Sequence, residues 1–487
     1  MFEQECIPFA PALIESMRSL GYSFPAAIAD LIDNSISAHA TNIEIYSEPS
    51  TDPFLVILDN GHGMNKNEIY EAMRYGCTNP LEDRRKDDLG RFGLGMKSAS
   101  LSQCRKFVVV SKKDCGLHAY SWDLDYIIKS KAWMLRGFSE EEILSLPMID
   151  LLKNKETGTL IILSDFDRIK ESTGNLSETF NKCLDDMINH LSLVFHRFID
   201  EGLNIYVNGL RVEAKDPFLM NHRSTQRKRE SSFYINDEEI SLKPFILPHI
   251  SKMSQEDLDK VGGKDRMRND QGFYVYRNKR LIIWGTWFRL ERKDELNKLA
   301  RVMVDIPNSL DYMWSIDIKK SSASLPDIIK KNMYNAVYES VTSSETVHTY
   351  RGRKEKHDKE IEYVWEKIKI REGYEYQINR KLPQLEMLES TLDGSEIKLL
   401  NSLLNTIEES LPVQTLYVDV AKGVIEEKKN DDEQFEKLWS DIQTQIEFVK
   451  RKNWSIKKYY SMFMNVEPYC NNKKLVNRIK EEIEKYE

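Results

Sequence analysis

The sequence lacks several features that mark specialised classes of protein. Its 487 residues include six cysteines, and no two of them form a C-x-x-C pair, so we expect reduced thiols rather than a zinc site or a disulfide framework. No apolar run approaches the roughly 20 residues that a membrane-spanning helix needs. Residues 1–5 are acidic and do not begin a signal peptide. These absences predict a cytoplasmic protein with no membrane association.

A large excess of charge of either sign is also missing. The formal net charge of −8 argues against a chain that coats nucleic acid, but it is compatible with a local basic groove, because binding depends on where the charges lie. One candidate for such a groove is the loop at residues 223–229, which holds Arg223, Arg227, Lys228 and Arg229. The same run also fits an ordinary solvated loop.

The length is sufficient for two or three domains, each with its own core. Predicted strands and helices alternate within residues 1–170 and within residues 171–344. Residues 345–487 instead hold charged, helix-prone stretches, the first of which is residues 360–370. These stretches show neither a repeat nor a heptad run long enough for a coiled coil. We therefore predict an α+β protein with an α/β domain over 1–170, a second α/β domain over 171–344 and a helical C-terminal region over 345–487.

An acid and an amide stand four residues apart in a helix predicted to begin near Ser23 and Pro25. Asp30 and Asn34 lie one turn from each other on the same side of that helix. A carboxylate such as Asp30 can orient a water molecule for attack on a phosphoanhydride, and the amide oxygen of Asn34 can bind Mg²⁺ without adding charge. Taken alone, the pair also fits the polar edge of an amphipathic helix.

The apolar strand predicted at residues 54–58 ends at Asp59, which two glycines follow. A buried carboxylate at this point can accept a hydrogen bond from the exocyclic amine of adenine. Gly61 and Gly63 let the backbone approach the base, and Met64 can pack on it. Further along the chain Thr159 opens another strand, where its hydroxyl can support the carboxylate. Each of these motifs alone also fits a structural turn.

A glycine-rich segment at residues 90–98 leads into a predicted helix. Successive backbone amides at such a start form an anion-binding concavity, which the helix dipole reinforces. It is neither a Walker A loop nor a Rossmann fingerprint. The polar stretch before it, residues 75–89, is a candidate lid. The residues predicted to bind phosphate, with Lys97 adding a point charge, are Gly93, Leu94, Gly95, Met96, Lys97 and Ser98.

In this order and spacing, the four motifs resemble the GHKL ATPase superfamily, which is named for gyrase, heat-shock-90 chaperones, histidine kinases and MutL. Residues 30–45 are especially similar to the MORC and MutL version of the first motif. The resemblance implies a Bergerat α/β sandwich, a transducer-like second domain, and ATP and Mg²⁺ as cofactors. It is specific over about residues 20–165 and looser over 200–340, and it does not reach 345–487.

The resemblance also implies roles for particular residues. Asp30 stands where hydrolysing members carry a glutamate base, Asn34 matches the magnesium asparagine, and Asp59 matches the adenine-binding aspartate. The family's glycine and threonine positions are matched by Gly61, Gly63, Gly93, Gly95 and Thr159.

Two departures from the family pattern stand in the first motif. Asp30 is one methylene shorter than glutamate, so we expect slow turnover. Ser37 stands where MutL-like sequences usually have an aspartate, so no salt bridge is expected there.

A lysine of the second domain is the remaining predicted catalytic residue. Residues 316–321 end a predicted strand and look like the segment from which hydrolysing members bring a lysine to the γ-phosphate. We predict Lys320 for this role, with Lys319 as the alternative, because strand alternation does not place the loop. Two solvated lysines at a strand end fit the same pattern.

The function that the resemblance implies is an ATP-operated conformational switch. A MORC- or MutL-like chain of this kind forms an ATP-dependent homodimer and acts on DNA or with a DNA-acting partner. No nuclease signature is visible, so cutting would belong to a partner protein, and a bacterial antiviral defence role rests on analogy alone. The alternatives are a chaperone-like clamp on protein clients, a non-hydrolysing nucleotide sensor, and a histidine-kinase-type phosphotransferase, for which His39 is badly placed.

Overall fold

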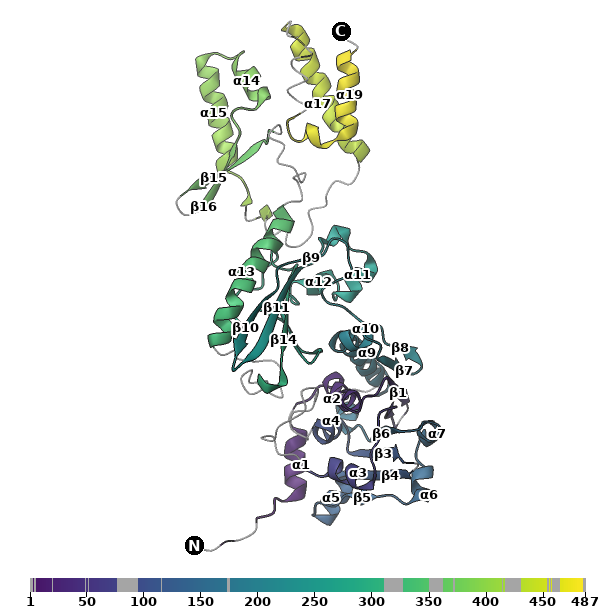
Figure 1. Cartoon of the computed structure of the whole chain (residues 1–487). Helices are drawn as coiled ribbons and strands as arrows, with labels where there is room; N and C mark the ends of the chain where they lie inside the picture. Colours follow the sequence, from purple (N-terminus) through teal and green to yellow (C-terminus); the bar gives the residue numbers. More distant parts are fainter. Residues whose placement is uncertain are drawn as a thin grey trace. The chain divides into compact units, whose positions relative to one another are not determined.

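The protein is a mixed α+β molecule, which confirms the class predicted from the sequence, and it divides into two compact units, Met1–Arg351 and Gly352–Glu487 (Figure 1). Among the residues that the structure describes, no helix is both long enough and apolar enough to cross a membrane. The computed structural model describes residues 3, 6–19, 21–48, 50, 52–76, 95–114, 116–172, 176–310, 327–349, 362–370, 373–413, 415–416, 431–452, 455, 457 and 465–484.

The first sheet of the first unit has eight strands in the order β5-β4-β3-β6-β2-β1-β7-β8. Its neighbouring strands are antiparallel except for β1 and β7, which are parallel. The strands are β1 (Asn42–Glu48), β2 (Phe54–Asp59), β3 (Lys106–Lys113), β4 (Gly116–Asp123), β5 (Arg136–Gly137), β6 (Gly158–Ser164), β7 (Asn204–Val207) and β8 (Leu210–Arg211).

The apolar strand β2 lies in the interior of this sheet, as its sequence predicts, and both of its faces are covered. Leu55 and Ile57 point into the main core, whereas Val56 and Leu58 pack in a second cluster with the small helices α6 (Glu140–Leu144) and α7 (Ile149–Lys153). This alternation is the period-2 geometry of a strand. The end of β2, where Asp59 stands, is therefore held rigidly from two sides.

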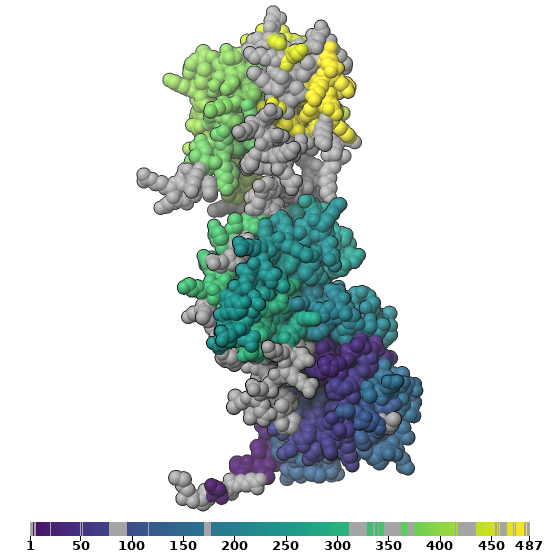
Figure 2. Space-filling view, in the orientation of Figure 1, coloured from purple at the N-terminus to yellow at the C-terminus, as the bar shows by residue number. Residues whose placement is uncertain are grey.

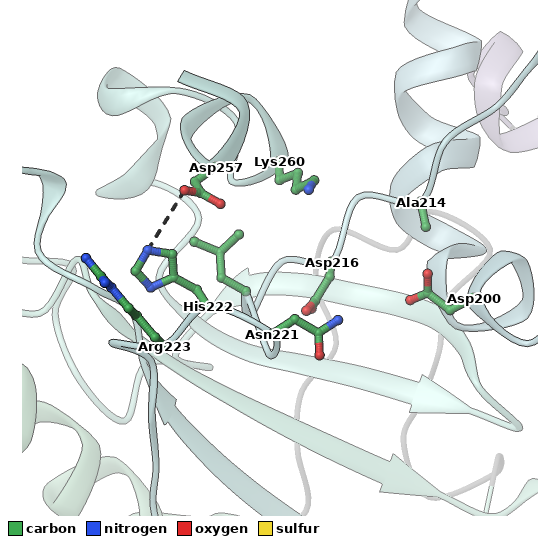
Figure 3. A pocket seen from close by; sticks show the side chains of 9 residues that line it. Asp200, Ala214, Asp216, Asn221, His222, Arg223, Asp257 and Lys260 are labelled. Atoms are coloured by element: carbon green, nitrogen blue, oxygen red, sulfur yellow. Dashed lines mark ion pairs between the residues drawn. The ribbon is translucent and has the colours of Figure 1, made fainter. Parts of the chain in front are cut away.

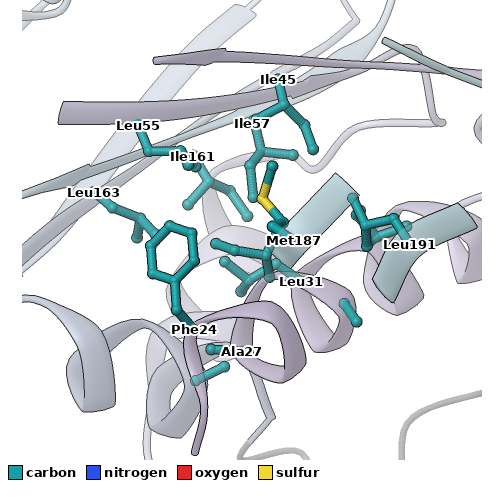
Figure 4. Packing of buried hydrophobic residues seen from close by; sticks show 14 of the residues in the cluster. Phe24, Ala27, Leu31, Ile45, Leu55, Ile57, Ile161, Leu163, Met187 and Leu191 are labelled. Atoms are coloured by element: carbon teal, nitrogen blue, oxygen red, sulfur yellow. The ribbon is translucent and has the colours of Figure 1, made fainter. Parts of the chain in front are cut away.

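Helix α2 (Phe24–Ser37) carries the first motif and lies on the main-core face of the sheet. It begins as predicted: Ser23 is the N-cap, its hydroxyl accepts a hydrogen bond from the Ala26 amide, and a proline occupies the first turn. Leu31 of α2 packs with Met187 and Leu191 of α9 (Leu176–Val194) over Ile57 (Figure 4). The remaining helices around this sheet are α1 (Ala10–Arg18), α3 (Lys66–Met73), α4 (Gly95–Gln103), α5 (Leu124–Ser130) and α8 (Asp167–Ser172).

The N-terminal sheet extends past the boundary predicted at residue 170. Asn208 and Gly209 predict a hairpin in the second domain. Strands β7 and β8 form this hairpin, but β7 pairs with the edge of β1 and so belongs to the first sheet. The reason is the long helix α9, whose apolar side packs on α2 and returns the chain to that edge. Local turn signals predict which strands form a hairpin, and they do not predict which sheet the hairpin joins. The domain boundaries themselves remain a prediction.

The second sheet has the order β10-β11-β14-β12-β13, with β9 beside β11, and α13 packs against β11 and β14. The hairpin of β12 and β13 turns at Asn278 and Lys279, and both residues have positive φ angles (46° and 69°). The elements are α10 (His196–Asp200), β9 (Gln226–Arg227), β10 (Ser231–Ile235), β11 (Glu238–Ile246), η1 (Ile250–Lys252), α11 (Gln255–Lys260), α12 (Lys264–Met267), β12 (Gly272–Arg277), β13 (Arg280–Thr286), β14 (Ala300–Ile306), η2 (Asn308–Leu310) and α13 (Asp327–Thr349).

The second unit is mostly helical, with one departure from expectation. Residues 360–370 read as helix-prone, yet β15 (Trp365–Ile370) is a strand that pairs with β16 (Gly373–Ile378). Polar and apolar residues alternate in β15, a pattern that suits a strand of a hairpin. Pairing with β16 overrides the helix propensity of the charged residues. The helices are α14 (Pro383–Glu389), α15 (Gly394–Glu409), α17 (Asp431–Arg451), η4 (Tyr469–Asn471) and α19 (Lys473–Glu484).

Candidate functional site

The centre of the candidate site is the carboxylate of Asp59, which is only 4% exposed. Three donors from three parts of the chain converge on it. The hydroxyl of Ser35 on α2 donates to Oδ2 at 2.8 Å, while the backbone amides of Gly61 and Thr159 donate to Oδ1 at 2.9 and 3.1 Å. Strand β2, the turn after it, helix α2 and the start of β6 therefore meet at one acidic group.

The hydrogen-bond count of this carboxylate leaves room for one more donor. A carboxylate offers about four acceptor positions, and the three donors use both positions of Oδ1 and one of Oδ2. Burial raises the pKa of Asp59, and the hydrogen bonds from Gly61, Ser35 and Thr159 oppose that rise. The remaining position on Oδ2 can accept a hydrogen bond from an amine such as that of adenine.

The turn after β2 is tied to β3 and β6 through side-chain hydroxyls. Thr157 donates to the Gly61 carbonyl at 2.7 Å, and the amide of Met64 donates to the hydroxyl of Ser111 at 2.8 Å. The Ser111 hydroxyl also lies 3.0 Å from that of Thr159. Thr159 therefore contacts Asp59 through its backbone amide. The sequence suggested that its hydroxyl supports the carboxylate, but the hydroxyl faces Ser111 instead.

Gly63 is a position where the fold of this turn admits no side chain. Its φ is +64°, and an added Cβ would lie 2.0 Å from the carbonyl oxygen of Lys112. We expect Gly63→Ala to lower the free energy of unfolding by at least about 2 kcal/mol, because the clash is with backbone and cannot be relieved by a rotamer change. Denaturant unfolding followed by circular dichroism measures this loss.

The matched control for that substitution is Gly209→Ala. Gly209 also has a positive φ of +82°, but nothing lies within 4 Å of an added Cβ there. Its substitution should cost only the backbone strain of an L-residue, about 1 kcal/mol. Equal losses at the two glycines would contradict the steric reading of Gly63.

The Asp30 and Asn34 side chains lie on α2, half-buried and exposed respectively. The Asn34 amide nitrogen donates to the Asp30 carbonyl at 3.1 Å, which leaves the amide oxygen as the group that can bind a cation. Tyr22 hydrogen-bonds to the Asp30 side chain. Burial, followed by the nearby Asp30 carboxylate, raises the pKa of Tyr22, so its hydroxyl stays protonated and can hold that carboxylate in place.

The start of α4 provides the described part of the glycine-rich segment. Lys97 is buried there, and its ammonium donates to the carbonyls of Ala72 and Arg74 at 2.8 and 2.9 Å, where the dipole of α3 favours a cation. Gly95 and Met96 are half-buried and Ser98 is buried. Gly93 and Leu94, residues 77–89 of the predicted lid, and the lysines Lys319 and Lys320 lie outside the described residues.

The donor set fits a magnesium ion that is held mainly by its nucleotide. In the described part of the chain, no group of three or more His, Cys, Asp or Glu side chains is placed to hold a metal ion. Mg²⁺ commonly binds through one or two protein oxygens and completes its octahedron with phosphates and water. The amide oxygen of Asn34 is a ligand of that kind.

A cavity of about 480 Å³ lies elsewhere in the first unit, beside α11 (Figure 3). None of the candidate nucleotide residues lines it. Asp200, Asp216 and Asp257 face it, and His222 lies 3.9 Å from Asp257. Its lining also includes the basic residues Arg223 and Lys260. The cavity is separate from the candidate nucleotide site because it shares no residue with it.

Ser35 and Ser111 are polar residues of the site that the sequence analysis did not identify, as are Tyr22 and Thr157. Ser35 continues the apolar stripe of α2 that includes Ile28 and Leu31, and Ser111 follows the apolar run of β3. A polar residue at a buried position of a predicted element was the available signal, because such a residue needs a partner.

Comparison with known proteins agrees with this geometry. Residues 22–159 match the family model described as Histidine kinase-, DNA gyrase B-, and HSP90-like ATPase. The mouse protein "ATPase MORC2B" is 36% identical over 92 residues, which are 18% of this chain and 9% of the relative. "ATPase morc-1" of Caenorhabditis elegans is 32% identical over 90 residues, which are 18% of this chain and 10% of the relative.

A further relative matches at lower identity. "DNA mismatch repair protein MutL" of Afipia carboxidovorans is 29% identical over 109 residues, which are 22% of this chain and 17% of the relative. The chain thus spans less than a fifth of the length of these curated relatives. A solved N-terminal domain of a DNA repair protein has a TM-score of 0.44 at 14% identity, covering 69% of this chain and 99% of its own.

Proposed function

We propose that this chain, whose N-terminal domain belongs to the GHKL ATPase superfamily in its MORC/MutL-like branch, binds and hydrolyses ATP as a conformational switch. The observation that carries the proposal is the buried carboxylate of Asp59, which three fixed donors orient and which retains one acceptor position. An acceptor at this point selects adenine, whose exocyclic group is a donor, over guanine, whose corresponding group is an acceptor. Met64, Gly61 and Gly63 would border the base.

The residues on α2 would act at the other end of the nucleotide. Asp30 would orient and deprotonate the attacking water, with the Tyr22 hydroxyl holding its carboxylate. Asn34 would bind Mg²⁺, which supplies charge neutralisation of the phosphate oxygens when it is bound. Gly93, Leu94, Gly95, Met96 and Ser98 would offer backbone amides to the phosphates, with Lys97 nearby, and Lys320 or Lys319 would approach the γ-phosphate.

A switch of this kind needs two states, and we propose that ATP favours a closed homodimer. A non-hydrolysable ATP analogue with Mg²⁺ should therefore double the mass measured by light scattering, because two protomers would close through their N-terminal regions. The variant Asp59→Asn provides the matched control, since it should stay monomeric with the analogue. An unchanged wild-type mass, in the presence of proven analogue binding, contradicts the dimer.

The client proposed for the switch is DNA or a DNA-acting partner, such as a nuclease in a bacterial antiviral defence system. Two observations support it: the relative MutL is named for DNA mismatch repair, and Arg223, Arg227 and Arg229 are exposed. The measurement is ATP hydrolysis with duplex DNA and, separately, with an unfolded protein. Stimulation by DNA supports this client, whereas stimulation by the unfolded protein alone favours the chaperone-like clamp.

A further inference from the structure

The tip of the β12–β13 hairpin contacts the helix that carries the candidate catalytic residues. Arg280 at this tip is 4% exposed, and its Nε donates to Oδ1 of Asp33 on α2 at 2.9 Å. Its NH1 donates to the Leu281 carbonyl at 2.6 Å, and the guanidinium lies 4.6 Å from the ring centre of Phe195. Both side chains are largely buried, so Figure 2 shows only the outer surface of the first unit, where early residues, in purple, border later residues, in blue to teal.

The position of Asp33 gives this ion pair its significance. Asp33 stands on α2 between Asp30 and Asn34, within one turn of both. It is 14% exposed on its side chain, so the attraction to Arg280 is little screened by salt. Because a helix moves as a rigid element, a displacement of Asp33 also displaces the neighbouring side chains on α2.

The guanidinium is suited to transmit such a displacement because it is fixed at several points. One nitrogen is held by Asp33, another by the backbone of its own strand, and the flat face by an aromatic ring. A planar, forked cation with these contacts has little freedom to swing, whereas a lysine on a flexible stem would absorb the movement. The neighbouring pair of Lys279 and Glu201 is about half exposed, so it is a weaker connection.

We propose that Arg280 is a positioning residue for ATP turnover, which acts through Asp33 to set the place of Asp30 and Asn34 and links α2 to the second sheet. The inference rests on the proposed function. It adds a route between the nucleotide site and the second sheet that uses described residues of β13. Since coupling is reciprocal, a change in the nucleotide site displaces β13, and a change in β13 displaces the site.

The test compares Arg280→Ala, Arg280→Lys, Asp33→Asn and the double variant Arg280→Ala/Asp33→Asn, with Lys279→Ala as the matched control. We expect Arg280→Ala to lower kcat about tenfold while the Kd for ATP changes by less than about threefold. Arg280→Lys should recover part of kcat, and the double variant should lose no more than the single ones, because they remove one shared interaction. Lys279→Ala should leave kcat unchanged.

A second readout needs no nucleotide. Hydrogen exchange of the free protein should rise in α2 when Arg280 is replaced and in β13 when Asp33 is replaced. A lower Tm with kcat and exchange unchanged in the folded protein would show a structural role alone and overturn the inference, as would an equal loss of kcat in Lys279→Ala. Wild-type protein that binds no ATP refutes the proposed function itself, whereas normal ATP turnover in Arg280→Ala overturns only the role of Arg280.

Discussion

Replacing Asp59 by asparagine should weaken ATP binding by more than about a hundredfold and leave the fold intact. The asparagine oxygen can keep the hydrogen bonds from the Gly61 and Thr159 amides. Its nitrogen would face Ser35, whose hydroxyl can rotate and accept instead of donating. The position left for the adenine amine would change from an acceptor to a donor, so two donors would face each other. Calorimetric titration measures the affinity, and the Tm checks the fold.

For another nucleotide, inosine triphosphate, we expect the same substitution to have the opposite effect on relative affinity. Inosine triphosphate carries an oxygen where ATP carries the exocyclic amine, so the new donor at position 59 should favour it. We therefore expect Asp59→Asn to raise the ratio of inosine triphosphate affinity to ATP affinity. Asp52→Asn, at an exposed carboxylate before β2, is the control and should change neither value. Unchanged ATP affinity in Asp59→Asn would refute the assignment of this residue.

The sequence predicts those parts of the fold that local signals determine. The start of α2 follows from a serine cap and a proline in the first turn, and the interior place of β2 follows from its apolar run. The membership of β7 in the first sheet depends instead on how α9 packs over α2. That packing joins residues far apart in the chain, and neither periodicity nor turn chemistry encodes it.

In the candidate site, too, local sequence signals predict some features, whereas others depend on contacts between distant parts of the chain. A carboxylate at the end of an apolar strand is visible in the sequence, and the structure buries it as expected, but the serine that holds it comes from another element. The ammonium of Lys97 was predicted to face phosphates, and it lies against the carbonyls of Ala72 and Arg74. A long side chain reaches several acceptors, and the choice between them depends on the folded surroundings, so the role of Lys97 remains a prediction.

Asp30→Ala should separate binding from hydrolysis. Asp30 makes none of the three hydrogen bonds that fix the adenine-reading carboxylate, so we expect the Kd for ATP to change by less than about threefold. Loss of the base should reduce phosphate release by about 10²–10⁴-fold. Calorimetry gives the first value, and a single-turnover assay gives the second, free of any effect of product release.

Two further variants distinguish loss of the base from loss of local order. Asp30→Asn keeps the size of the side chain and an oxygen that can accept the Tyr22 hydroxyl, yet it cannot take a proton, so it should be as inactive as Asp30→Ala. Asp30→Glu restores a carboxylate and adds the missing methylene, so its hydrolysis should equal or exceed that of the wild type. If Asp30→Asn hydrolyses ATP normally, the proton goes to another group, and Asp30 only orders the helix.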